Sequence, residues 1–317
     1  MESIVKISLD GKPFEKLIDV VSKGIGTLYR PRQIRKEADA RAYEIKVIEE
    51  AKSLAASEGK LIEAETNERI AQRLVAKEIR RQENIDSVVE MAAKNLEGVD
   101  VTDKPVDEDW ATRFFDIVQD VSKEEMKVLW AKILSKEIEK PSSYSLRTLE
   151  VLRNISFEEA DLFVKLSGFV LNQSDYFIFA EHETMEKHGI WYKDYAKLRE
   201  IGILQAGDFV TTTFDTDPNN PSIVNIVYGN HLLKFTIPPS TVGVEIPVIL
   251  LTQAGQEIYG LIESKHNWDY IRDIFIYINK MHPSSTLHYG KVSEIIGDQV
   301  KTETPLKEFI LADDIHK

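Results

Sequence analysis

The chain has 317 residues, of which 43% are hydrophobic and 29% charged; its formal net charge is -13 and it contains no cysteine. This length allows two or three domains, and the lack of cysteine excludes disulfides, thiol catalysis and cysteine-based metal sites. Of the charged residues, 19 basic and 20 acidic ones occur through Lys104, against 21 and 33 beyond it, so the C-terminal two thirds lacks the positive field that nonspecific nucleic-acid binding needs.

Residues 1–30 are predicted to form an N-terminal amphipathic element. A short strand is expected over residues 3–9, and apolar residues then recur at helical spacing as far as Ile25. Gly24 and Gly26 end or loosen this helix, and Pro31 suits the first turn of the next one. The pair of glycines lacks the spacing of a phosphate-binding loop. The basic residues that follow are the candidate contact patch for acidic lipid, nucleic acid or protein: Arg30, Arg32, Arg35 and Lys36.

Residues 31–97 are predicted to form one long charged helix or a helical hairpin. The segment is rich in Ala, Glu, Lys and Arg, has no proline after Pro31, and carries a narrow apolar stripe. Such a stripe needs a partner to cover it. We therefore expect a coiled-coil pairing within the chain or between copies, and a homo-oligomer.

Residues 98–107 are the predicted linker to a helical bundle domain over residues 108–172. Ser122 with Glu125, and Ser156 with Glu159, have the spacing of capping boxes that start helices. The sequence KPSS at residues 140–143 breaks the helix between them. The side chains expected in the core of this block, and not as ligands, are Trp130, Leu134, Leu146 and Leu149.

Residues 173–282 change character and are predicted to form a domain of helices and strands, followed by a C-terminal tail over residues 283–317. A helix is expected over residues 191–201. Two runs rich in β-branched residues, 224–228 and 231–237, flank Gly229-Asn230, which is a two-residue hairpin signal. A strand over 246–251, a helix over 253–263 capped by Thr252, and a helix over 268–280 complete the domain.

This region resembles the last helix, wing and following helix of a winged helix module. The residues that carry the resemblance are Leu198, Gly202, Ile203, Leu204, Leu251, Thr252 and Gly255. The wing region, 205–250, is unusually long. The helix that would enter a DNA groove offers only Lys193, Lys197 and Arg199, against two acidic residues. Since a DNA-reading helix presents several phosphate and base contacts, we favour a protein-interaction domain over a DNA reader.

No catalytic, metal or cofactor site is predicted. His182 and His188 are six residues apart, which differs from the spacing of four that places two zinc ligands on one helix face. Asp215, Asp217 and Asn219 alternate like calcium ligands, but Pro218 and the missing glutamate depart from that loop. No Gly-x-Ser-x-Gly elbow is present.

Two stretches, Lys16 to Ala42 and Glu108 to Ser156, resemble bacterial proteins grouped as the domain of unknown function 2806. The second contains LWAKIL followed by EKPSSYSLRTLEVL, and the likeness spans roughly residues 15 to 265. A looser likeness to abortive-infection alpha proteins implies a role in phage defence or stress response and supplies no catalytic residues.

Together these patterns predict an α+β, mostly helical fold with long N-terminal helices, a central helical block and a C-terminal winged-helix-like domain. The predicted function is a non-enzymatic assembly and interaction protein that self-associates through its N-terminal helices and presents the C-terminal domain to a protein partner. The alternatives are a DNA-binding regulator and a peripheral membrane-acting defence effector. No apolar run approaches the roughly 18 residues that span a bilayer, so we expect a cytoplasmic protein, with contact at the inner membrane surface as the variant.

Overall fold

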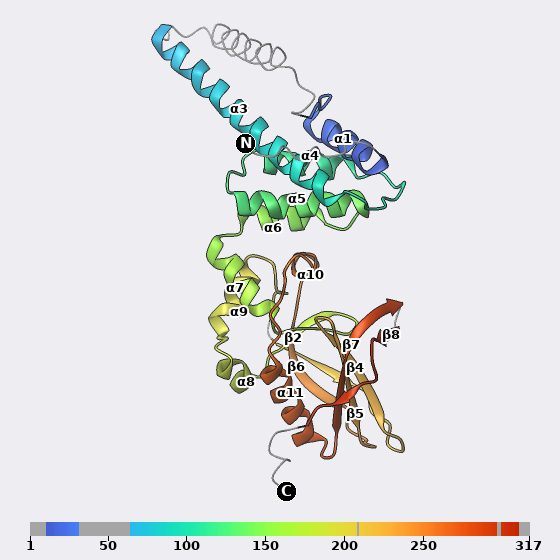
Figure 1. Ribbon diagram of the computed structural model, residues 1–317. Coiled ribbons are helices and arrows are strands. Elements are labelled where there is room, and N and C mark those ends of the chain that lie inside the picture. Colours follow the sequence, from blue (N-terminus) through green and yellow to red (C-terminus); the bar gives the residue numbers. More distant parts are fainter. Residues whose placement is uncertain (1–10, 32–63, 208, 297–298, 311–317) are drawn as a thin grey trace, which may run out of the picture. The chain divides into compact units, whose positions relative to one another are not determined.

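The computed structural model describes residues 11–31, 64–207, 209–296 and 299–310. The chain divides into two compact units, Met1–Leu149 and Glu150–Lys317, which are described separately. The predicted α+β class is confirmed: helices make up the first unit, and a nine-stranded antiparallel sheet lies in the C-terminal half (Figure 1). Among the described residues no helix has both the length and the apolar character that crossing a membrane requires.

The first unit is a bundle of helices. α3 packs along α5 and α1 packs along α4. No helix or strand lies within residues 98–107, the segment predicted as a linker. The predicted strand over 3–9 and the first part of the predicted long helix, 32–63, lie outside the described residues. The elements of this unit are α1 (Lys12–Ile25), α3 (Ala64–Asn95), α4 (Glu108–Val118), α5 (Glu124–Glu139) and the start of α6 (Leu146–Asn154).

The apolar stripe of α3 is covered from within the chain over its C-terminal half. There the stripe residues are at most 8% exposed, and α5 lies alongside. Nearer the start of the helix, Ala71 and Val75 are also buried, at 7% and 8% exposed, whereas Leu74 and Ile79 are 38% and 41% exposed. The buried residues of the C-terminal half are Ile85, Val88, Val89, Ala92, Ala93 and Leu96.

Glycine is needed at positions 24 and 26 for two different structural reasons. A Cβ on Gly24 would lie 2.3 Å from Cδ2 of Phe115 and 2.8 Å from the carbonyl oxygen of Ala111, so only glycine allows α1 to approach α4 this closely. Gly26 ends α1 with φ 71°, the left-handed conformation common after a helix. The apolar face of α1, which includes Leu17 and Val21, is buried in the bundle.

The turn between α5 and α6 is organised by one buried carboxylate. Glu137 is 1% exposed. Its Oε1 accepts a hydrogen bond from the backbone N–H of Ser142 (2.6 Å), and its Oε2 accepts two more, from Ser143 (2.9 Å) and Tyr144 (3.0 Å). The KPSS segment therefore breaks the helix as predicted, with its backbone donors satisfied by the preceding helix.

One of the two predicted capping boxes is confirmed and one is wrong. Ser156 accepts from the backbone N–H of Glu159, whose carboxylate accepts from the N–H of Ser156, at the start of α7. α5 instead begins after Lys123, with no side-chain cap. Of the four predicted core residues, Trp130, Leu134 and Leu149 are at most 1% exposed, and Leu146 is half-buried.

The second unit combines helices with the antiparallel sheet. The predicted helices over 191–201, 253–263 and 268–280 are present, the second of them shorter than expected. Its helices are α7 (Phe157–Ser167), α8 (His182–Lys187), α9 (Tyr192–Glu200), α10 (Gln253–Tyr259) and α11 (Trp268–Met281). Its strands are β1 (Val170–Asn172), β2 (Tyr176–Phe179), β3 (Val210–Phe214), β4 (Ser222–Tyr228), β5 (His231–Ile237), β6 (Val244–Leu250), β7 (Thr286–Ile296), β8 (Gln299–Thr302) and β9 (Lys307–Glu308).

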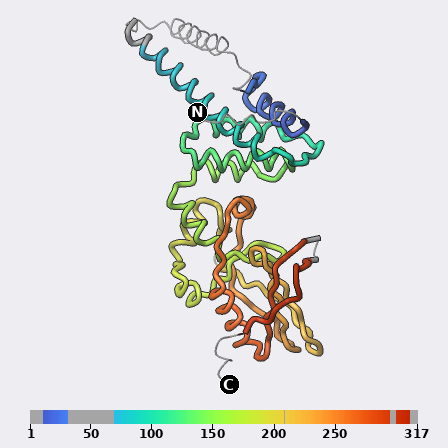
Figure 2. The backbone as a smooth tube through the Cα atoms, in the orientation of Figure 1, coloured from blue at the N-terminus to red at the C-terminus, as the bar shows by residue number. Residues whose placement is uncertain are grey.

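The sheet has the strand order β3-β6-β2-β1-β4-β5-β7-β8, and β9 pairs with β7. The predicted hairpin is the β4–β5 pair, whose turn contains Gly229 with φ 57°. The tail predicted from residue 283 instead supplies β7, β8 and β9. Figure 2 shows the path of this orange-to-red segment, whose strand β7 pairs with β5.

The helices predicted as one central block fall into both units. α4 and α5 belong to the first, whereas α7 belongs to the second, because the boundary lies within α6. In the second unit α7 lies beside α9, and Phe169, just beyond α7, contacts the ring of Tyr270 on α11 with ring centres 5.0 Å apart.

Candidate functional site

The candidate site is the exposed start of α9, the helix that the sequence singles out as the alternative DNA-contact helix. One face of α9 is fixed in the core: Tyr195 is 3% exposed and Leu198 is fully buried. At the N-terminal end, Trp191 is 47% exposed and Tyr192 is 59% exposed. Two large aromatic side chains on adjacent residues therefore face solvent where the helix begins.

The three basic residues of α9 have different surroundings. Lys193 is exposed. Lys197 Nζ lies 3.3 Å from a carboxylate oxygen of Glu158 on α7. The guanidinium carbon of Arg199 lies 5.5 Å from the centre of the Phe209 ring, and its Nε and one terminal nitrogen are buried without a hydrogen-bond partner among the described residues. Lys197, whose side chain is 40% exposed, thus forms a surface ion pair, whereas the guanidinium of Arg199 is partly buried against Phe209.

The turn that leads into α9 is held by α7. Gly189 has φ 71° in this turn, and its carbonyl oxygen accepts a hydrogen bond from Lys165 Nζ at 2.6 Å. The following residue, Ile190, is 1% exposed. The backbone N–H of Trp191 donates to the Asp194 carboxylate at 2.9 Å, which closes the first turn of the helix.

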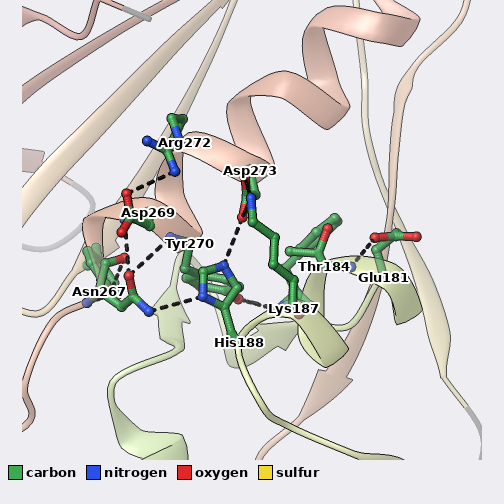
Figure 3. Close-up of polar contacts among 11 residues, drawn as sticks. Glu181, Thr184, Lys187, His188, Asn267, Asp269, Tyr270, Arg272 and Asp273 are labelled. Carbon is green, nitrogen blue, oxygen red and sulfur yellow. Dashed lines mark hydrogen bonds and ion pairs between the residues drawn. The ribbon is translucent and has the colours of Figure 1, made fainter. Parts of the chain in front are cut away.

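A polar cluster holds the same turn to α11 (Figure 3). His188 Nε2 lies 2.8 Å from Asp273 Oδ2, and Lys187 Nζ donates to both oxygens of that carboxylate at 2.8 and 2.9 Å. The amide nitrogen of Asn267 lies 3.2 Å from His188 Nδ1. The side chains of His188 and Asp273 are 8% and 9% exposed.

This cluster resembles an acid–base pair, but its imidazole has no free nitrogen to offer a substrate. An imidazole has two nitrogens, and both are engaged here, one by Asp273 and the other by Asn267. A general base must reach the proton that it removes. The cluster therefore links the end of α8 to α11, directly before the exposed aromatic residues in the sequence.

A shallow groove of about 420 Å³ lies beside this cluster, between α8 and α11. Glu181 on its wall accepts hydrogen bonds from the backbone N–H groups of Glu183 (3.3 Å) and Thr184 (2.7 Å) and so caps α8. Burial alone raises the pKa of Glu181, but these hydrogen bonds outweigh it and the net pKa is lowered. The Glu181 carboxylate is therefore used to cap α8. The groove is lined by Glu181, Glu183, Thr184, Lys187, Asp273, Ile276, Tyr277, Lys280 and Met281.

The end of α9 is joined to the start of α10 by the motif residues identified in the sequence. Thr252 Oγ1 lies 2.6 Å from the carbonyl oxygen of Gly202 and accepts from the N–H of Gly255. Gly202 has φ 79°. A Cβ on Gly255 would lie 2.2 Å from the carbonyl oxygen of Ile203. The pattern of threonine and two glycines is thus explained by backbone packing.

Of the candidate basic patch, only Arg30 is described, and it is exposed just beyond α1. Arg32, Arg35 and Lys36 lie outside the described residues. His182 is exposed and faces Glu186, whereas His188 is in the cluster above. Over the part of the chain that the structure covers, no three His, Asp or Glu side chains gather as metal ligands would.

Trp191 and Tyr192 are the residues that sequence reasoning missed as candidates. The sequence pattern places them only within a helix. Their position between the turn signal at Gly189 and the apolar pair Tyr195 and Leu198 is the available sequence clue, because residues four and seven after Trp191 mark the buried face. Their exposure itself depends on contacts of the preceding turn with α7 and α11, which the local sequence does not show.

A family model described as a protein of unknown function, DUF2806, matches residues 68–275, about two thirds of the chain. The chain belongs to this family, as the resemblance in its sequence predicts. No curated protein and no solved structure matches it.

Proposed function

We propose that this member of the DUF2806 family is a non-enzymatic interaction protein whose second unit is a winged-helix-like module that binds a protein partner through the start of α9. The helical unit is the scaffold in this proposal. The observation that carries it is the surface of α9, where two aromatic side chains are exposed, Lys197 is paired with Glu158 at the surface and Arg199 lies against Phe209.

The order of elements supports the winged-helix-like assignment. α7, α8 and α9 are followed by β3 and β6, which pair with each other, and β6 also pairs with β2. The segment between β3 and β6 contains the additional β4–β5 hairpin. This insertion accounts for the unusual length of the wing region.

The chemistry of the surface favours protein over DNA. Exposed aromatic side chains supply large contact areas at low entropic cost, and they are enriched among the residues that dominate binding energies. The fastening of the turn by Lys165 and Asp273 keeps these side chains preorganised. DNA binding instead depends on released counterions. On α9, Lys197 is paired with Glu158 and Arg199 lies against Phe209, which leaves less positive charge for phosphate contacts.

The other predicted functions depend on separate features. Self-association through residues 31–97 has support in the described part of that segment from exposed Leu74 and Ile79. Contact with anionic lipid would depend on the basic patch, because the apolar face of α1 is buried in the bundle. A role in phage defence stays a prediction from the sequence likeness.

The proposal is tested by placing a photo-crosslinking amino acid at Tyr192 in the full chain, within the cells from which the protein comes. We expect discrete protein adducts that disappear in the Trp191→Ser variant. The same amino acid at Glu183, an exposed position on α8, is the control for nonspecific capture.

Adducts that nuclease removes, lost in a Lys193→Ala, Lys197→Ala and Arg199→Ala variant, would instead establish the DNA-binding regulator. Lipid adducts would establish the membrane alternative. Equal labelling from Tyr192 and Glu183 would refute a specific interface on α9.

A further inference from the structure

One end of the sheet is an open strand. β3 is the terminal strand and pairs with β6 on one side only. Its sequence is VTTTF, without charge, proline or glycine. Val210 is 47% exposed, and Thr211 and Thr213 are also exposed. Edge strands of this kind present unpaired backbone groups that can pair with another strand.

The opposite end of the sheet is protected. The pairing of β7 with β8 shifts register between Val292 and Glu294, which is a bulge or irregularity. β8 also carries Lys301, whose Nζ lies 2.9 Å from Glu294. Bulges and lysines are the devices that prevent edge-to-edge pairing. β3 has neither among its five residues.

Pro247 identifies which backbone groups of β3 point outward. It lies opposite Thr211, has no N–H, and its carbonyl oxygen accepts from the N–H of Ala180 on its other side (2.8 Å). Residues of an antiparallel pair alternate between exchanging both hydrogen bonds and exchanging none. Thr211 and Thr213 therefore direct their N–H and C=O groups away from β6.

We infer that β3 is an interface for a second copy of this chain, which adds its own β3 in antiparallel orientation with Thr212 on the twofold axis. Thr211 then lies opposite Thr213 of the second copy, and both outward N–H groups and both outward carbonyls of each strand form hydrogen bonds. A twofold contact of this kind uses the same patch on both copies and closes on itself.

The side chains of β3 are complementary to themselves in this register. Thr211 meets Thr213 on one face, and Val210 meets Phe214 on the other, which are pairings that stabilise antiparallel strands. No charged group of β3 opposes a like charge, although the chain as a whole carries -13. This inference is independent of the function proposed for α9.

The absence of cysteine from the chain permits a direct test of the register. Single cysteines are placed at Thr211, Thr212 and Thr213 in the full chain, and disulfide formation under oxidation is measured on non-reducing gels. Residues facing each other in a non-hydrogen-bonded pair have Cα atoms about 4.5 Å apart, within the range of a disulfide. We expect covalent dimer from Thr212→Cys and little from its two neighbours.

The second measurement is sedimentation of the cysteine-free chain over a range of concentrations. Thr211→Pro removes an N–H that the β3–β6 ladder does not use, and proline is tolerated on edge strands. It should weaken the dimer about tenfold or more, whereas Thr211→Val, which keeps the N–H, should not. Circular dichroism confirms that both variants fold. A monomer at all concentrations, equal crosslinking at the three positions, or a dimer unaffected by Thr211→Pro would overturn the inference.

Discussion

Replacing Glu137 with glutamine removes the charge that organises the α5–α6 turn. The carboxylate accepts three backbone hydrogen bonds at 2.6, 2.9 and 3.0 Å and is 1% exposed. The glutamine side chain keeps one oxygen and turns an NH₂ group toward N–H donors. At least one hydrogen bond is lost and a buried donor is left unsatisfied.

The size of the effect follows from these contacts. A hydrogen bond to a charged group contributes about 1.5–3 kcal/mol, and an unsatisfied buried donor costs about 1–3 kcal/mol. We expect Glu137→Gln to lower the free energy of unfolding of the first unit by about 3 kcal/mol. In a domain of this size that loss lowers Tm by roughly 6–12 °C.

The matched control is Glu139→Gln in the same helix. Glu139 is 45% exposed, and its carboxylate lies 3.9 Å from Lys136. Because exposed ion pairs contribute about 0–1 kcal/mol, this variant should unfold almost like the parent.

Thermal unfolding gives the global effect, and hydrogen exchange of the amides of residues 142–144 gives the local one. Equal Tm values and equal exchange in the two variants would show that the carboxylate does not hold the turn.

Two further predictions concern the second unit. Asp273→Asn should destabilise this unit by about 2–4 kcal/mol and lower its Tm, because a buried carboxylate that binds Lys187 and His188 is lost. The control is Asp269→Asn, which alters an exposed ion pair with Arg272. Equal Tm values for the two variants would show that Asp273 does not hold α8 to α11. Burial lowers the pKa of His231, with smaller contributions from His266 and Lys291, and burial also lowers the pKa of His266. The unfolded chain then takes up protons first, so stability is full above the ordinary value of 6.5 and is lost as pH falls below it. Calorimetry between pH 7.5 and 5.5 should show this loss, and a His231→Gln, His266→Gln variant should show less of it; an unchanged slope would contradict the assignment.

Local sequence signals predicted most helices, because periodicity and caps act within a few residues. Ser156 and Glu159 form the expected box. Ser122 and Glu125 have the same spacing, yet α5 starts one residue later. The preceding turn is held by α3, where Arg81 binds Asp120 and Asn84 donates to the carbonyl oxygen of Gln119. Contacts across more than thirty residues are invisible to a local rule.

The sheet and the site were harder to predict for the same reason. β7 pairs with β5, so that Thr286 lies opposite Thr236, far from it in the sequence. A local pattern in either strand does not identify such a distant partner. The exposure of Trp191 and Tyr192 depends on Asp273 and Lys165, which come from other helices. Lys197 and Arg199 were correctly placed on a helix, but their partners Glu158 and Phe209 come from other segments.

β7, which pairs with β5, lies outside the region that the family model matches. The family-matched region ends at residue 275, whereas the strand that covers the outer side of β5 begins at Thr286. The chain thus completes the matched region with a donor strand of its own. Removing β7 would leave β5 as a second exposed edge strand with unpaired backbone groups. A shortened form of this protein should therefore aggregate before it loses its helices.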